Sequence, residues 1–289
     1  MKPSPALSHT AVRRVASGSA TEDSPDILAV EEPLEIRLGI PGNGHRAISI
    51  TMRTPGNDGE LAAGFLFTEG IIRSADDVKE IRHCGLKIGK IANTIDRAAA
   101  LNSNTIRVDL AENVEVNLKS LERHFYTTSS CGVCGKSSIE ALHTNASKLA
   151  AADHPKIDTE TIHSLPDRLR RSQNIFDQTG GLHASALFTS DGGIEIVRED
   201  VGRHNALDKV IGAKFLAGEL PLSDKVLLVS GRASFELVQK ALVAGIPILA
   251  AVGAPSSLAV ELAREFGMTL IGFVRDESFN VYSGPERVV

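Results

Sequence analysis

Residues 184–274 constrain the fold most, because short apolar stretches alternate there with stretches of helical spacing. Alternation of this kind is typical of βαβ units with right-handed crossovers. We therefore expect a mostly parallel sheet with helices on both faces. In chain order, the expected elements are strands at 184–188 and 194–198, a helix at 205–217, a strand at 226–230, a helix at 234–244, a strand at 246–252, a helix at 256–266 and a strand at 269–274.

A smaller unit of different character precedes this segment. Leu34, Ile36 and Leu38 alternate with charged residues, and the chain alternates again at 48–52 after the turn at 41–44, so a hairpin is predicted. The other elements expected in this unit are a helix from Leu61 toward Gly70 and strands at 105–110 and 114–116.

The sequence therefore predicts an α/β protein with two domains. A small β-rich α+β domain is expected at residues 29–125, and a layered α/β domain at residues 126–289. Residues 1–28 have no apolar periodicity, and we expect a disordered tail there.

Composition excludes several classes of protein. The 289 residues carry 31 Lys and Arg against 36 Asp and Glu, a net charge of −5, so we do not expect nonspecific nucleic-acid binding. The longest uncharged apolar runs, at 226–229 and 246–252, are far shorter than the ~20 residues of a membrane-spanning helix, so no membrane association is expected. No apolar stretch follows Arg13 and Arg14, and we therefore expect a cytoplasmic protein without a secretory signal.

Cys131 and Cys134 form a C-x-x-C pair in a glycine-rich loop, directly before a predicted helix at about 138–151. Such a pair serves structural zinc sites, dithiol redox chemistry or a nucleophilic thiolate. A structural zinc needs four ligands, but Cys84 is the only other thiol, and His124 and His143 lack ligand spacing.

The surroundings of the cysteine pair favour the nucleophilic thiolate. The neighbouring Lys136 and the amides of the following helix start stabilise a thiolate, while Gly132 and Gly135 keep it accessible. A buried, inert role is the usual fate of a lone cysteine, and we expect it for Cys84.

A second set of candidate residues follows the late strands, at the edge where open α/β sheets bind ligands. The turns at 230–234 and 253–257 lead into helices that begin at serine, and Arg232 lies in the first turn. Helix N-termini with an arginine suit a phosphate or pyrophosphate group. Ordinary N-capping by Ser234 and Ser256 explains each turn equally well when it is considered alone.

Polar residues are also dense at 199–205, just after the Gly-Gly-Leu-His stretch at 180–183, and again at 53–56. Each stretch predicts either a functional site or a solvated loop with a capped helix. His183 alone is explained equally well as a buried core histidine.

Several stretches together resemble the FdhD family, the formate dehydrogenase accessory sulfurtransferases. They cover the chain from about residue 32 to its end. The matching stretches are residues 50–56, 60–66, 129–138, 179–183, 199–209, 230–235 and 253–258.

The resemblance implies a sulfur carrier. It would take persulfide sulfur from a cysteine desulfurase and deliver it to the bis-pterin guanine dinucleotide cofactor of formate dehydrogenase. This cofactor contains molybdenum or tungsten, and the molybdenum form is Mo-bis(molybdopterin guanine dinucleotide). Cys131 would carry the persulfide and Cys134 would assist. The alternative is a non-catalytic chaperone that binds the cofactor and uses the cysteine pair for zinc.

The resemblance also implies a fold, an oligomeric state and a cofactor site. The large domain would be similar to the cytidine deaminase fold, the protein a homodimer, and no permanently bound metal is expected. The family's cofactor-binding segment falls on Phe273, Val274, Arg275, Asp276, Glu277 and Ser278, to which the turns add Arg232 and Ser256.

Overall fold

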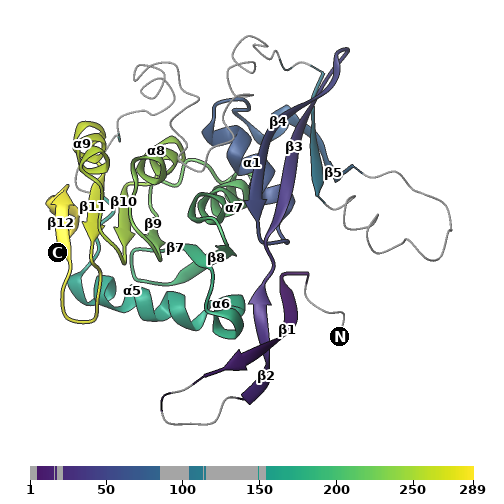
Figure 1. Ribbon diagram of the computed structural model, residues 1–289. Coiled ribbons are helices and arrows are strands. Elements are labelled where there is room, and N and C mark those ends of the chain that lie inside the picture. Colours follow the sequence, from purple (N-terminus) through teal and green to yellow (C-terminus); the bar gives the residue numbers. More distant parts are fainter. Residues whose placement is uncertain are drawn as a thin grey trace.

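The computed structural model describes residues 5–15, 17, 22–84, 104–112, 114, 149 and 154–289. These residues form two main sheets and a two-stranded ribbon (Figure 1). The mixture of sheets and helices confirms the predicted α/β class. The likeness to the cytidine deaminase fold stays a prediction.

The larger sheet has the order β12-β11-β10-β9-β7-β8. The central strands β9, β10 and β11 are parallel, but every other pair of neighbours is antiparallel. The expectation of a mostly parallel sheet is confirmed for β8 to β11, which run in one direction, but it is wrong for β7 and β12, which run in the other. Short links join β7 to β8 and β11 to β12, and short links can only join antiparallel neighbours. The strands are β7 (His183–Phe188), β8 (Ile194–Asp200), β9 (Val226–Val229), β10 (Ile248–Ala251), β11 (Thr269–Gly272) and β12 (Asn280–Ser283).

Helices cover both faces of this sheet, as predicted. One face carries α7 (Arg203–Leu216), α8 (Phe235–Val243) and α9 (Ser257–Phe266), while α5 (Thr159–Arg171) packs on the other and α6 (Asn174–Thr179) follows it (Figure 1).

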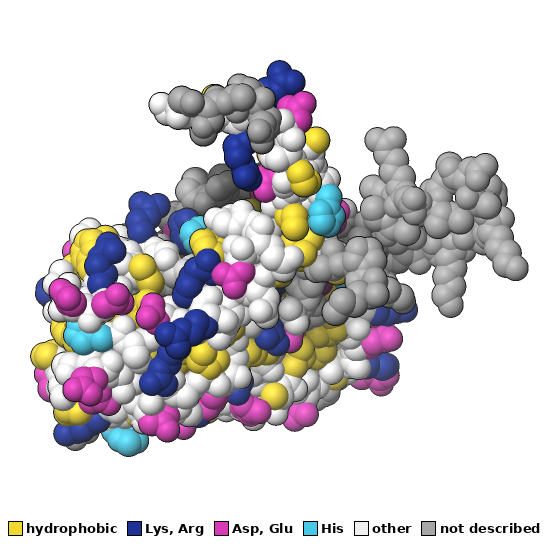
Figure 2. Space-filling model, turned by 90° about the horizontal axis from the view of Figure 1, so that it is seen from below, with side chains coloured by type: hydrophobic (Ala, Val, Ile, Leu, Met, Phe, Trp, Pro, Cys, Tyr) yellow, Lys and Arg dark blue, Asp and Glu magenta, His cyan; other side chains and the backbone are white. Residues whose placement is uncertain are grey.

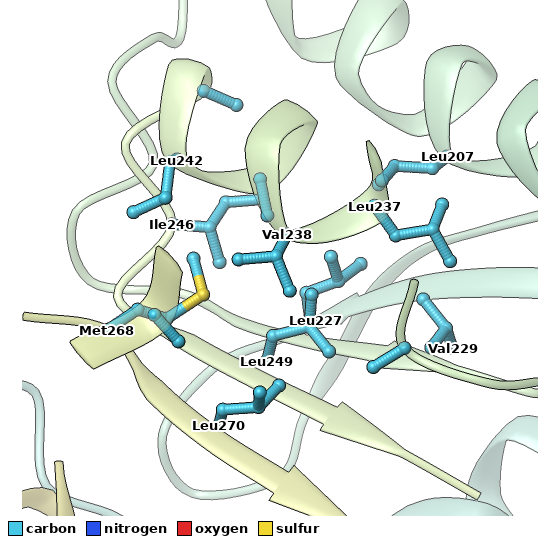
Figure 3. Packing of buried hydrophobic residues seen from close by; sticks show 14 of the residues in the cluster. Leu207, Leu227, Val229, Leu237, Val238, Leu242, Ile246, Leu249, Met268 and Leu270 are labelled. Atoms are coloured by element: carbon cyan, nitrogen blue, oxygen red, sulfur yellow. The ribbon is translucent and has the colours of Figure 1, made fainter. Parts of the chain in front are cut away.

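Side chains of the central strands alternate between these two faces. Leu227 and Val229 of β9 join the cluster under α8 (Figure 3), whereas Val226 and Leu228 pack with α5. Burial on both faces explains why β9 is a continuous apolar run and not an alternating one.

The smaller sheet has the order β4-β3-β6-β5 and packs one face against α1 (Asp58–Thr68). The predicted hairpin is confirmed, since β3 and β4 are antiparallel, and the helix and the strand at 105–110 are confirmed too. Of the strand expected at 114–116, only Val114 is described, and it lies outside any strand. The strands are β3 (Glu32–Ile40), β4 (Gly44–Arg53), β5 (Val78–His83) and β6 (Thr105–Leu110), and short 3-10 turns lie at Ala75–Asp77 and Pro285–Arg287.

The N-terminal region contains two strands where the sequence predicts a disordered tail. β1 (Leu7–Arg14) and β2 (Glu22–Ala29) pair antiparallel along their whole length. The ribbon is held by main-chain hydrogen bonds and most of its side chains are exposed, so it does not require the apolar periodicity on which the prediction depended.

The two sheets are joined by the crossing of α1 and α7. Their backbones approach closely at Gly64 and Gly212: a Cβ on Gly64 would lie 1.9 Å from the Asp208 carbonyl oxygen. Nearby, the Arg198 guanidinium of β8 pairs with the Glu60 carboxylate of α1. The domain boundary predicted at residues 125 and 126 lies outside the described residues and stays a prediction.

Candidate functional site

The loops after β9, β10 and β11 meet at one edge of the larger sheet. The Gly253 amide donates to the Gly231 carbonyl at 2.9 Å, and the Phe273 amide donates to the Gly253 carbonyl at 3.1 Å. A Cβ on Gly253 would lie 3.0 Å from the Gly231 oxygen, a tighter contact than side chains normally make, so glycine favours this approach. The three loops therefore form one continuous surface.

Phe273 lies on this surface in an uncommon backbone conformation. Its φ is +56°, in the left-handed region that non-glycine residues rarely adopt, and the residue is 37% exposed. Strained, exposed residues of this kind cluster at binding sites. The next residue differs, because Val274 is buried among the residues that pack against α5. The Val274 side chain is therefore part of the core, and its predicted contact with the cofactor stays a prediction.

The rest of the predicted cofactor segment, Arg275 to Ser278, is an exposed turn closed by the Arg275 amide on the Ser278 carbonyl at 3.0 Å. His163 of α5 anchors it, since its Nδ1 donates to the Arg275 carbonyl at 2.7 Å and its ring lies 4.9 Å from the ring of Phe279. The exposed side chains of Arg275, Asp276, Glu277 and Ser278 lie next to Phe273 in the chain.

The two serine turns have different roles in the structure. Ser256 is an ordinary N-cap, because its hydroxyl accepts the Ala259 amide at 3.3 Å. Ser234 makes no such cap bond, and its hydroxyl lies 3.4 Å from His204 Nε2. Arg232, in the same turn, is exposed.

The polar stretch at 199–205 is partly structural. Buried Lys209 lies 2.7 Å from the buried Asp200 carboxylate and donates to the Thr54 carbonyl at 3.0 Å. The Thr54 amide in turn donates to Asp200 at 3.1 Å, and Asn205 donates to Met52. These bonds join the two sheets, so Asp200 and Asn205 belong to a buried structural junction and not to the solvated, capped loop that was the structural alternative.

The stretch at 53–56 takes part in the same junction. Arg53 is almost fully buried and pairs with Asp58 and Glu32, each at 3.1 Å. This arginine is therefore held by carboxylates of its own domain and is not presented to a ligand.

A group of titratable residues lies beside the strand-end surface: His183, Arg203, His204 and Glu236. His183 begins β7 next to Gly231, and a Cβ on Gly231 would lie 3.4 Å from His183 Nδ1. Burial lowers the pKa of His183, and the positive charges of Arg203 and His204 lower it further. His204 lies 3.8 Å from Glu236, and the nearby His204 imidazole lowers the pKa of Glu236 to about 2.

His183, Arg203 and His204 lie in stretches that the sequence marks as candidates, but Glu236 does not. Glu236 follows His204 by 32 positions and lies in the first turn of α8, where an acidic residue is an ordinary feature of a helix start. No local pattern connects the two residues, since only the packing of α7 against α8 brings them together.

Cys131, Cys134 and Lys136 lie outside the described residues, so their predicted roles stay predictions. The described Cys84 is partly buried, and its amide donates to the Thr105 carbonyl at 2.9 Å. Within the described ranges, no group of three or more His, Cys, Asp or Glu side chains could hold a metal ion.

Basic and acidic side chains both occur over the described part of the face shown in Figure 2. None of the helices in the described ranges is long and apolar enough to cross a membrane.

Comparisons with known proteins give one consistent answer. A protein named sulfur carrier protein FdhD from Streptomyces coelicolor is 53% identical over 279 residues, which is 96% of this chain and 94% of the relative. The protein of that name from Mycobacterium tuberculosis is 50% identical over 96% of this chain and 98% of its own length. The one from Saccharolobus solfataricus is 41% identical over 95% of each chain.

A solved structure and a family model agree with these relatives. The structure comes from Desulfotalea psychrophila and its name describes a formate dehydrogenase accessory protein; it is 26% identical, with a TM-score of 0.70 over 99% of this chain and 100% of that chain. The model of the FdhD/NarQ family matches residues 29–289, which include the strand-end surface and the C-x-x-C pair. The chain therefore belongs to the FdhD/NarQ family.

Proposed function

We propose that this protein is a cytoplasmic sulfur carrier that activates formate dehydrogenase. The observation that carries the proposal is the C-x-x-C pair at Cys131 and Cys134 in a chain that matches proteins named sulfur carriers over nearly its whole length. A cysteine desulfurase would be the donor, the formate dehydrogenase apoenzyme the recipient, and a homodimer the working form.

The loading step is an exchange at sulfur. The Cys131 thiolate attacks the outer sulfur of the donor persulfide, the donor S–S bond breaks, and the donor cysteine leaves as a thiolate. Cys131 then carries the persulfide. The Cys134 thiolate can attack the inner sulfur, which forms a Cys131–Cys134 disulfide and releases the outer sulfur as hydrosulfide.

The acceptor would be Mo-bis(molybdopterin guanine dinucleotide), bound as a substrate at the strand-end surface. The chemistry of that surface suits a nucleotide: the exposed ring of Phe273 offers a stacking face, and Arg232 and Arg275 offer positive charge. The amides at the start of α8 lie at the same edge and favour phosphate.

The proposal predicts that Cys131→Ala abolishes activation of formate dehydrogenase. The test expresses each variant in a bacterial strain that lacks its own family member, then measures formate-dependent dye reduction in extracts. Cys84→Ala is the matched control, because it also removes one thiol, and it should retain activation near the wild-type level.

Full activation by Cys131→Ala would contradict the proposal. Zinc bound in a 1:1 ratio to the purified protein, and lost in both Cys131→Ala and Cys134→Ala, would contradict it as well and favour a chaperone with a structural metal.

A further inference from the structure

The polar stretch at 199–205 contains two residues that the junction between the sheets does not use. Glu199 accepts the amides of Ile175 and Phe176 at the start of α6, while Asp200 and Asn205 join the two sheets. Arg203 and His204 remain. Both belong to the first turn of α7, at the strand-end edge of the larger sheet.

Arg203 has a guanidinium N–H that lacks a hydrogen-bond partner among the described residues. In the part of the chain that the structure describes, its Nε is buried and has no hydrogen-bond partner. The Arg203 side chain as a whole is only partly buried, but a guanidinium N–H that is buried without a partner is costly, and such groups are normally satisfied by a partner or a bound ion. The positive charge of Arg203 also acts on His183, where it opposes protonation.

The nearby carboxylates are already engaged. Asp200 lies 2.7 Å from Lys209 and also accepts the Gly202 amide at 2.8 Å. Glu236 is engaged by His204 at 3.8 Å. Three basic side chains, those of His183, Arg203 and His204, thus gather at this edge. Asp200 is paired with Lys209, outside this group, whereas Glu236 is paired with His204 within it.

The start of α7 adds to this positive region. The helix has 14 residues, its N-cap is Gly202, and it has neither a side-chain cap nor an acidic residue in its first turn. The positive end of the helix dipole is therefore not neutralised by the helix itself. The start of α8 lies beside it, because His204 contacts Ser234.

We infer that Arg203, His183 and His204 form an anion-binding subsite that holds a phosphate group of the nucleotide-bearing substrate. The inference rests on the proposed function, and it extends the site from the loops after β9 to β11 toward β7 and α7. Arg203 supplies the main charge, and His204 is positioned by Glu236. His183 adds a second charge when the bound anion offsets the repulsion from Arg203.

The test measures the binding of inorganic pyrophosphate to the full chain by isothermal titration calorimetry at pH 7. Arg203→Gln should weaken pyrophosphate binding about tenfold, the loss of one charge-assisted hydrogen bond. Arg82→Gln is the matched control, because Arg82 is half exposed on the smaller sheet, and its affinity should stay within about twofold.

A second readout separates this role from a purely structural one. Histidine proton NMR should show a higher pKa for His183 in Arg203→Gln than in the wild type, and pyrophosphate should raise the pKa of His183 in the wild type only. Unchanged thermal unfolding of the variant confirms that it is folded.

Pyrophosphate affinity in Arg203→Gln equal to that of the wild type would overturn the inference, and so would the absence of saturable binding to the wild type. Neither result bears on sulfur loading of Cys131, which is measured without nucleotide. The same titration is repeated with guanosine diphosphate. If Arg203→Gln weakens guanosine diphosphate binding as much as it weakens pyrophosphate binding, Arg203 contacts the diphosphate, whereas unchanged affinity for guanosine diphosphate contradicts that contact.

Discussion

At the scale of single residues, the contact between His204 and Glu236 should make stability depend on acid. The pKa of Glu236 is lowered from 4.5 to about 2 by the nearby His204 imidazole. A carboxylate with a lowered pKa in the folded state stabilises the fold above the unfolded value, and this contribution is lost as pH falls from about 4.5 toward 2. We predict that Glu236→Gln removes this part of the pH dependence.

The measurement is the free energy of unfolding in urea from pH 6 to pH 2.5. Over this interval, we expect the free energy of unfolding to fall by about 1 kcal/mol more in the wild type than in Glu236→Gln. The difference is small because solvent screens this partly exposed pair. Glu261→Gln is the control, since Glu261 is an exposed glutamate on α9. Identical pH profiles of wild type and Glu236→Gln would refute the assignment.

At the scale of elements, the crossing of α1 and α7 depends on two glycines. A Cβ on Gly64 would lie 1.9 Å from the backbone oxygen of Asp208, and a Cβ on Gly212 would lie 1.8 Å from that of Glu60. Backbone atoms cannot move aside as a flexible side chain can. We predict that Gly64→Ala forces the helices apart and destabilises the protein by about 1–3 kcal/mol.

Gly59→Ala in the same helix is the control. A Cβ there meets only the Ile81 side chain, at 3.5 Å, an ordinary contact. Because alanine favours helix over glycine by roughly 0.5–1 kcal/mol, this variant should be as stable as the wild type or slightly more so. Equal stability of both variants in urea unfolding would mean that the close crossing does not matter.

The elements also show what the sequence could and could not predict. The strands and helices between residues 184 and 274 are confirmed because their apolar spacing is local information. Strand direction is not local, which is why the antiparallel neighbours of β9 and β11 were missed. The helix α5 was missed because Pro166 lies inside it and its composition is largely polar.

At the scale of the whole molecule, the candidate site depends on contacts between residues far apart in sequence. Asp200 receives the Thr54 amide from 146 positions away, and this junction fixes the start of α7 relative to the larger sheet. The sequence located the strand-end turns and the polar stretch at 199–205. It could not separate Arg203 and His204 from the structural Asp200 and Asn205, because only the folded contacts distinguish them.

The central claim also concerns the whole molecule: a reactive thiol at Cys131 supplies sulfur to a substrate bound at the strand-end surface. The direct measurement is intact-protein mass spectrometry after incubation with a cysteine desulfurase and cysteine, with and without reductant, followed by peptide mapping. A gain of one sulfur atom that maps to Cys131 and is removed by reductant is the predicted result. No added sulfur on Cys131 or Cys134, with a desulfurase shown to be active, would contradict the account.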